Sequence, residues 1–271
     1  MNRAEQLMQH VGHLTTSVGA AYPGSRAVFR GHDLHHDLGD LGWFELCAFG
    51  ITGRRLPKDH LRVLEFIWTS TSYPDARIWN NRVAALAGTT RSTPNLALTA
   101  GHALSEAMIY GRRNEYRALT FFARTVQEMK GGATLADCLA RHLQHQGKLA
   151  GYGRPLASGD ERIAPTMALA RELGLADGPH VTLAFEVERE LLSQGKQLKM
   201  NYGALVSAFG ADFGLTGREF TMLFFPVFVG GMQPCYLEAA AKPPGAVFPT
   251  PCGDVRYRGT PKRAWPGSAP G

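Results

Sequence analysis

Histidine and aspartate side chains gather near the N-terminus in a pattern that could hold a metal ion. The segment contains His32, Asp33, His35, His36 and Asp37. On a helix, His32 and His36 would share one face at i, i+4 spacing, as a pair of metal ligands can. A third ligand is not evident in the sequence. We therefore expect no metal in this protein.

Two other segments carry polar groups that could contact a ligand. Asn80, Asn81 and Arg82 precede an Ala-rich run and could donate hydrogen bonds to a carboxylate or a phosphate. The same residues could equally open a helix, with Trp79 packed in the core. His102 lies in an apolar helical segment, where we interpret it as a core or pocket-wall residue in preference to a catalyst.

Helical periodicity dominates the segments that must position these groups. Apolar residues recur at three- and four-residue spacing in residues 59–69, 134–146, 163–173 and 181–192. Thr134 is suited to cap the second segment, and Gly174 and Gly195 are suited to end the third and fourth. Strand signals are few and do not alternate with helices, which argues against a parallel α/β sheet. The pattern predicts an all-α fold with only short strands or a hairpin.

The composition is that of a folded chain with a substantial core. Of the 271 residues, 44% are hydrophobic. The four cysteines are scattered without a C-x-x-C pair, which argues against a disulfide framework and a structural zinc site. The N-terminus has no apolar leader, and no stretch approaches the roughly 20 apolar residues of a membrane span. We expect a soluble, cytoplasmic protein with no membrane partner.

The charge of the chain is moderately basic and diffuse. The net charge is +6 and the pI is about 9.3, but adjacent arginines occur only at Arg54-Arg55 and Arg112-Arg113. Nucleic-acid binding usually needs a basic run or patch, so nucleic acid is not the expected partner. A phosphate-rich small ligand such as coenzyme A would explain this basicity equally well.

Short glycine-rich and charged motifs follow one another in a definite order along the chain. They are Phe29–Leu34, Leu41–Glu45, Gly53–Pro57, Gly151–Arg154, Gly159–Arg162, Lys199–Gly203 and Asp254–Gly259. In this order they resemble motifs of the citrate synthase and citryl-CoA lyase superfamily, and the resemblance extends from about Arg26 to Gly259. In length the chain is closer to the stand-alone citryl-CoA lyases than to ordinary citrate synthases.

The resemblance implies an all-α, citrate synthase-like architecture. A large helical domain would comprise residues 1–110 and 200–259, and a smaller helical domain, residues 111–199, would be inserted between them. Residues 260–271 are rich in Pro and Gly and are expected to form a flexible tail. The resemblance further implies a homodimer, a ligand cleft between the domains, an acyl-CoA ligand (a coenzyme A thioester as substrate) and a Claisen-type reaction that makes or breaks a carbon-carbon bond.

The positions that should perform this chemistry depart from the family pattern. Asn114 and Arg154 stand where the family has histidines, and Lys199 stands where it has a carboxylate base. Asn and Arg can stabilise developing oxygen charge, but neither shuttles a proton readily. Lys199 could act as a base only if burial or a neighbouring cation lowered its pKa. We expect the three side chains to converge on one cleft that binds an anion.

Each of these residues also has a structural interpretation. Arg154 could pair with Asp160, Lys199 could be a solvated surface lysine, and Asn114 could be a turn residue after Gly111. A small shift of the alignment would offer Glu115 or Asn201 instead.

The substrate contacts implied by the resemblance are also incomplete. Phe228 occupies the position of a citrate-binding arginine, whereas Arg162 is retained, together with Arg256 or Arg258 near the C-terminus. Ordinary citrate or oxaloacetate is therefore not the expected substrate. Two hypotheses follow. The protein is either an enzyme that acts on another acyl-CoA, or a catalytically inactive homologue that serves as a ligand-binding or regulatory protein.

Overall fold

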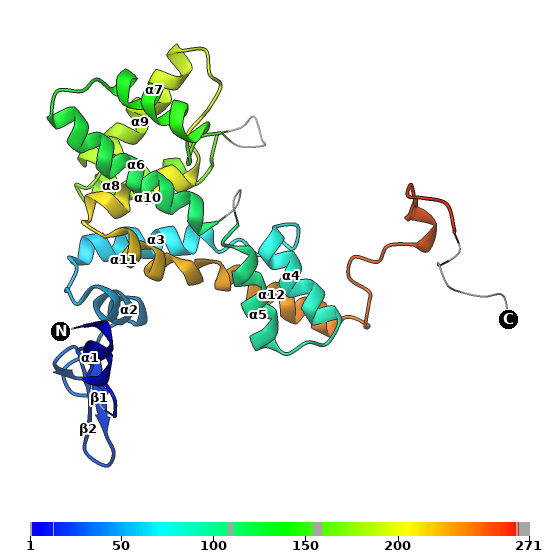
Figure 1. The fold of residues 1–271 in the computed structure, drawn as a ribbon, viewed down its shortest axis with the longest axis horizontal. Helices are drawn as coiled ribbons and strands as arrows, with labels where there is room; N and C mark the ends of the chain where they lie inside the picture. Colours follow the sequence, from blue (N-terminus) through cyan, green and yellow to red (C-terminus); the bar gives the residue numbers. More distant parts are fainter. Residues whose placement is uncertain (1, 13, 108–110, 154–158, 264, 266–271) are drawn as a thin grey trace.

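The computed structural model describes residues 2–12, 14–107, 111–153, 159–263 and 265, and it is dominated by helices (Figure 1). The elements are α1 (Arg3–Met8), β1 (Gly19–Tyr22), β2 (Arg26–Phe29), β3 (His32–Asp33), α2 (Trp43–Thr52), α3 (Lys58–Thr71), α4 (Trp79–Thr89), α5 (Pro94–Leu104), α6 (Arg112–Lys130), α7 (Leu135–Gln146), α8 (Ile163–Glu172), α9 (Pro179–Ser193), α10 (Tyr202–Asp212), α11 (Gly217–Phe224), the 3₁₀ turn η1 (Phe225–Phe228), α12 (Val229–Ala241) and η2 (Cys252–Asp254). The all-α prediction is confirmed.

The local signals in the sequence coincide with the observed helix ends. The Thr134 hydroxyl accepts a hydrogen bond from the Asp137 amide at the start of α7. Gly174 and Gly195 adopt positive φ angles of 68° and 76° just beyond α8 and α9, where a residue without Cβ is favoured. Helix boundaries in these segments therefore follow from capping and periodicity.

The N-terminal strands form one small antiparallel sheet in the order β1-β2-β3. His32 lies in β3, and His35 and His36 follow in a turn whose amides donate to the Asp33 carboxylate at 2.9 and 3.0 Å. The helical register that would pair His32 with His36 is therefore not formed. Among the described residues, no group of three or more metal-ligating side chains comes together.

Helix α10 lies at the centre of the larger group of helices. It packs against α6 and α9, and residues 204–210 of α10 are all buried. In Figure 1, α6 to α10 form the upper body, with α3 and α11 beneath it. The sequence-based boundary at residue 200 assigned α10 to the large domain, whereas its packing partners belong to residues 111–199.

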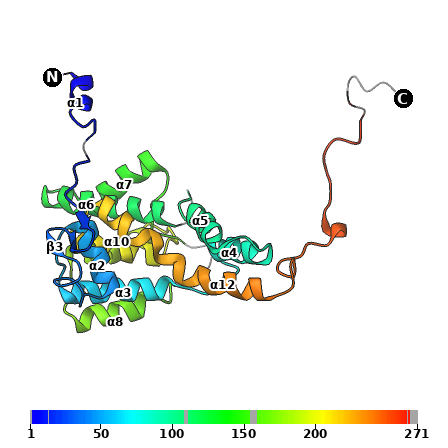
Figure 2. The same cartoon turned by 90° about the horizontal axis from the view of Figure 1, so that it is seen from below.

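Helices α4, α5 and α12 form a second group beside this body (Figure 1). Gly88 of α4 allows close approach to α12, because an added Cβ would lie 2.5 Å from the Tyr236 carbonyl oxygen. Beyond α12 the chain extends away from the helices towards the C-terminus, as Figure 2 also shows.

Among the described residues, one continuous helical stretch is long and apolar enough to cross a membrane by length and composition. It is Gly217–Ala241, with a mean hydropathy of 1.3 in its most apolar window. Buried core helices pass the same test, and Phe220, Leu223, Phe224 and Met232 of this stretch are buried in the core. The expectation that no stretch approaches a membrane span is therefore not met as far as length and composition are concerned.

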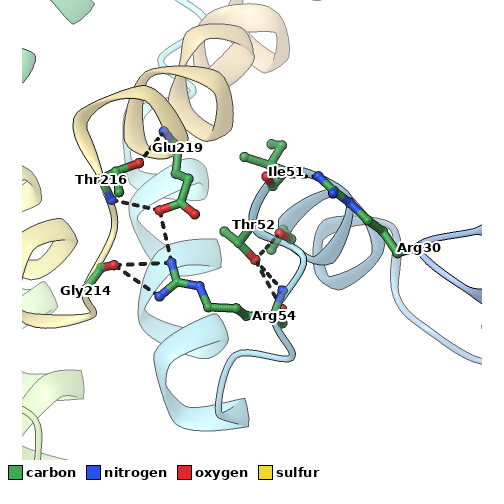
Figure 3. Close-up of polar contacts among 8 residues, drawn as sticks. Arg30, Ile51, Thr52, Arg54, Gly214, Thr216 and Glu219 are labelled. Carbon is green, nitrogen blue, oxygen red and sulfur yellow. Dashed lines mark hydrogen bonds and ion pairs between the residues drawn. The ribbon is translucent and has the colours of Figure 1, made fainter. Parts of the chain in front are cut away.

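Two arginines connect the N-terminal elements to this core (Figure 3). Arg30 donates to the Gly50 carbonyl from Nε at 3.0 Å and from Nη2 at 2.7 Å, so the sheet is held on α2. Arg54, just after α2, donates to the Gly214 carbonyl at 3.2 Å and pairs with Glu219 at 3.0 Å. Glu219 also accepts from the Thr216 amide and so caps α11. The end of α2 is thus fastened to the start of α11.

Replacing Arg54 by Met removes its hydrogen bonds to the Gly214 carbonyl and its ion pair with Glu219. The free energy of unfolding should fall by only about 1 kcal/mol, because the Arg54 side chain is half exposed to solvent. Arg55→Met is the matched control, since Arg55 is exposed beside it. Urea denaturation measures both variants. Equal effects of the two substitutions would contradict a specific role for Arg54.

Candidate functional site

A cavity of about 510 Å³ lies where several segments of the chain meet. They are the segment after α3, the start of α4, the first turn of α6, the loop before residue 154, the segment before α8, the start of α10, and η1. Asn80 and Asn81, which the sequence suggested as ligand contacts, line the cavity at the start of α4. Its wall includes apolar groups such as Ile78, Leu149 and Phe228, and several amides. Cavities that combine an apolar wall with a few converging polar groups are typical ligand sites.

The loop Gly151–Gly153 is held against the start of α10 by backbone hydrogen bonds. The Gly153 amide donates to the Lys199 carbonyl at 2.7 Å, and the Asn201 amide donates to the Gly151 carbonyl at 2.9 Å. Gly151 has φ 89°, and an added Cβ would lie 2.7 Å from the Ala204 Cβ. Glycine is therefore required here both for the backbone conformation and for the close approach.

Asp160 organises one side of the cavity. Its fully buried carboxylate receives two hydrogen bonds from Arg162, from Nε and Nη2, each at 2.8 Å. It also accepts from the backbone amide of Tyr202 at 2.9 Å. A carboxylate at a helix N-terminus is favoured by the helix dipole, so the start of α10 is already satisfied by an anion of the protein itself.

The Arg162 guanidinium lies between two tyrosine rings. Its Cζ is 4.5 Å from the Tyr202 ring centroid and 5.3 Å from that of Tyr73. The Tyr73 hydroxyl donates to Glu161 at 2.7 Å, and burial, followed by this hydrogen bond, raises the pKa of Tyr73 to about 12. Tyr73 therefore stays protonated and connects the segment after α3 to the segment before α8.

A second ion pair lies across the cavity, in the first turn of α6. Arg112 pairs with Glu115, and its guanidinium lies 4.7 Å from the Phe228 ring centroid. Burial raises the pKa of Glu115, while Arg112 and Arg162 act in the opposite direction. Gly203 leaves room for this side chain, since an added Cβ there would lie 3.2 Å from the Glu115 Cγ. A carboxyl of raised pKa in a cavity is a candidate for proton transfer.

A basic pocket of about 400 Å³ adjoins the cavity between α6 and α7. Arg117, Arg124, His142 and Lys148 contribute to its wall, and none of its described lining residues is acidic. Burial, and then the neighbouring Arg124, lowers the pKa of His142. Lys148 and Ala150 line both spaces, so the two are neighbours.

Comparison with known proteins shows which fold carries this site. The structure superposes on a citryl-CoA lyase from Hydrogenobacter thermophilus with a TM-score of 0.81 and 22% sequence identity, over 93% of this chain and 97% of that one. An ATP citrate lyase from Methanothrix soehngenii, solved with citrate and coenzyme A, gives a TM-score of 0.71 at 14% identity, over 97% of this chain and 45% of that one. This chain has the citrate synthase fold.

A citrate synthase from Thermoplasma acidophilum, solved with carboxymethyl coenzyme A and oxaloacetate, has the same fold. Its TM-score is 0.65 at 17% identity, over 83% of this chain and 58% of that one. The chain thus spans about half the length of the citrate synthase and the ATP citrate lyase, but nearly all of the citryl-CoA lyase. No protein-family model and no curated protein sequence matches it.

Within the citrate synthase fold, the residues predicted to act on the substrate occupy different places. Asn114, Asn201 and Arg162 line the cavity. Lys199 contributes its carbonyl to the loop contact, but its side chain is exposed and is not part of the cavity wall. Arg154 lies outside the described residues. Of the three residues expected to converge on one cleft, Asn114 lines this cavity and the side chain of Lys199 does not. The convergence itself stays a prediction.

The other predicted contacts lie away from the cavity. Arg82 lies over the Phe248 ring at 4.6 Å. His102 packs near Phe225, and burial lowers its pKa. Arg256 and Arg258 are exposed on the extended C-terminal segment. None of these four residues lines the cavity as described.

Sequence reasoning named Glu115 as an alternative and Arg162 as a substrate contact, but it missed the ion pairs that these residues form inside the cavity. Arg112 and Glu115 form an i, i+3 pair, a signal that is visible in the sequence but common on helix surfaces. Asp160 and Tyr202 lay within quoted motifs, but nothing local indicated that the Asp160 carboxylate would bind the Tyr202 amide across 42 residues. Their roles depend on tertiary contacts.

Replacing Gly151 by Ala should destabilise the fold by roughly 2 to 4 kcal/mol, because positive φ and contact with Ala204 act together. Gly147→Ala is the matched control, since Gly147 also has positive φ, 69°, but open space around it. That variant should lose only about 1 kcal/mol. Thermal and urea denaturation measure the difference, and similar losses would contradict the close approach.

Proposed function

We propose that this protein binds a coenzyme A thioester and makes or breaks a carbon-carbon bond next to the thioester carbonyl, on a substrate other than ordinary oxaloacetate or citrate. The observation that carries the proposal is Glu115, a buried carboxyl of raised pKa on the wall of a cavity that lies beside a basic pocket. Relatives of the same fold were solved with coenzyme A or its derivatives, which supports this ligand.

The two neighbouring spaces suit the two parts of such a ligand. The basic pocket, with Arg117, Arg124 and Lys148, is suited to the phosphates of coenzyme A. The cavity, with amides and apolar groups, is suited to the acyl group. Lys148 and Ala150 belong to the walls of both spaces, so the thioester is proposed to lie beside them.

Glu115 is the group proposed to move the proton. In the condensation direction, its carboxylate takes a proton from the carbon next to the thioester carbonyl, and the resulting enolate attacks a second carbonyl carbon. The alkoxide formed from that carbonyl then takes the proton back from Glu115. In the cleavage direction, Glu115 takes the hydroxyl proton of the substrate, the carbon-carbon bond breaks, and the bonding electron pair forms the thioester enolate. The enolate then regains the proton on carbon. Asn114 and Asn201 are the proposed hydrogen-bond donors to developing oxygen charge.

Glu115→Gln should lower kcat by roughly a hundred- to ten-thousand-fold, because Gln keeps the shape of the side chain but cannot accept the proton. Coenzyme A affinity should change little, since the proposed phosphate contacts lie in the other pocket. The assay is condensation and cleavage over a panel of short acyl thioesters and carbonyl compounds. Citrate formation from acetyl-CoA and oxaloacetate should stay undetectable or very low.

Two variants complete this test. Glu186→Gln removes the carboxylate of a surface i, i+3 pair with Arg189 and should leave turnover unchanged. Lys199→Met examines the base expected from the sequence. If Lys199→Met abolishes turnover and Glu115→Gln does not, the sequence-based assignment is right and Glu115 is not the base.

The pH dependence of the wild-type protein gives an independent test. A base must be ionised, so kcat/KM should rise with pH through the pKa of Glu115. Burial raises that pKa above the ordinary 4.5 of a glutamate, so the acid limb should lie above pH 4.5. The pH-rate profile of the wild-type protein measures this limb. An acid limb at or below pH 4.5 would exclude Glu115 as the base.

The second hypothesis, an inactive homologue that binds a ligand, is favoured by one observation. Both arginines of the described part of the cavity wall are engaged by carboxylates of the protein itself. Coenzyme A binding without turnover of any thioester in the panel, by protein shown to be folded, would support this alternative.

A further inference from the structure

One side chain of the basic pocket contacts basic residues from two different parts of its wall. His142, in α7, lines the pocket together with Arg124 of α6 and Lys148, which follows α7. Arg124 Nη2 lies 3.3 Å from His142 Nδ1, and the imidazole also forms a hydrogen bond with the Lys148 backbone. His142 therefore joins α6, α7 and the loop after α7 at this pocket.

The contact with Arg124 determines which nitrogen of His142 carries the proton. A guanidinium can only donate hydrogen bonds, so Nδ1 is the acceptor and the proton of the uncharged ring is on Nε2. Burial, and then Arg124, lowers the pKa of His142, while the hydrogen bond with the Lys148 backbone raises it. The ring is therefore uncharged near neutral pH, and it offers Arg124 an acceptor without cancelling the charge of the guanidinium.

This acceptor is itself held in a defined orientation. The imidazole meets the Phe121 ring edge to face, with 4.8 Å between the ring centroids and an angle of 67° between the planes. Phe121 is buried in the core and lies in α6, one turn before Arg124. The position of Nδ1 is thus fixed by packing against a rigid part of the fold.

Arg124 needs such a contact if its guanidinium is to stay in one place. Its side chain is 52% exposed, and Glu128, one turn further along α6, lies 3.6 Å from its Nε. An exposed pair at i, i+4 spacing restricts a long side chain only weakly. Contact with His142 adds a restraint on the pocket side, and a cation that is ordered beforehand loses less conformational entropy when it binds a ligand.

We propose that His142 is a positioning residue for phosphate binding: its Nδ1 acceptor holds the Arg124 guanidinium in the basic pocket, where it binds the phosphates of coenzyme A. This inference rests on the proposed function, because it takes the pocket as the site of those phosphates. It adds that His142 acts through Arg124, as an uncharged acceptor.

Isothermal titration of the full chain with coenzyme A tests the inference. His142→Leu and His142→Phe keep an apolar group against Phe121 but remove the acceptor, so each should weaken binding roughly five- to tenfold. His142→Asn should keep most of the affinity, because its amide oxygen can accept from Arg124. A loss in His142→Asn as large as in His142→Leu would contradict the acceptor role.

A histidine in the same helix supplies the matched control. His145 is exposed and is not among the described lining residues of the pocket, so His145→Leu should leave the affinity unchanged. Circular dichroism verifies that the variants are folded. Two apolar replacements of different shape at His142 ensure that a packing defect in one of them does not decide the result.

A double-mutant cycle separates positioning of Arg124 from a general structural role. Arg124→Met should weaken coenzyme A binding roughly tenfold or more. Adding His142→Leu to Arg124→Met should cause no further loss, because the contact through which His142 acts is already gone. If His142→Leu has the same effect in both backgrounds, or none in either, the inference is overturned while coenzyme A binding and the proposed function stand.

Inorganic pyrophosphate distinguishes failure of the inference from failure of the proposed function. If coenzyme A does not bind but pyrophosphate binds and shows the same pattern in the cycle, the coenzyme A part of the proposed function fails and the inference stands for a phosphate site. If neither ligand binds the wild-type protein, both proposals are overturned.

Discussion

The carboxylate of Asp160 is the contact on which the arrangement of the site depends. It is fully buried, and it joins the segment before α8 to the start of α10 through the Tyr202 amide while it holds Arg162. Arg162 in turn lies on Tyr73, which follows α3. Three parts of the chain that are distant in sequence therefore meet at one carboxylate. Without it, Arg162 would be a buried cation without its counter-charge and α10 would lose the partner of its first amide, both of which are costly.

The contact between Asp160 and the Tyr202 amide also depends on how closely the neighbouring segments approach α10. Gly151 allows the loop before residue 154 to touch α10, and Gly203 leaves space for Glu115 beside the first turn of that helix. Helix α10 is almost entirely apolar and buried, so its position is set by packing on α6 and α9. Packing places the helix, and the polar groups at its N-terminus then have few possible partners.

The sequence predicted the helices well because helix ends and periodicity are local properties. Thr134 and Gly174 mark helix ends by the chemistry of a few neighbouring residues. It also pointed to residues of the cavity wall, namely Asn80, Asn81, Asn114, Asn201 and Arg162, with Glu115 as an alternative to Asn114. The site was harder to predict because side-chain direction depends on tertiary contacts. Met200 pairs with Tyr152 in an isolated bridge and is buried, and its neighbour Lys199 is exposed to solvent.

The pairing of Arg112 with Glu115 could not be derived from the sequence for a related reason. An i, i+3 pair on a helix is normally a solvated surface feature. Here the first turn of α6 faces the start of α10 and the Phe228 ring, so the pair is buried and its energetics change. Burial keeps the two charges together and raises the pKa of Glu115, and both effects come from exclusion of water. The burial that distinguishes this pair from a surface pair therefore also sets how readily the Glu115 carboxyl holds a proton.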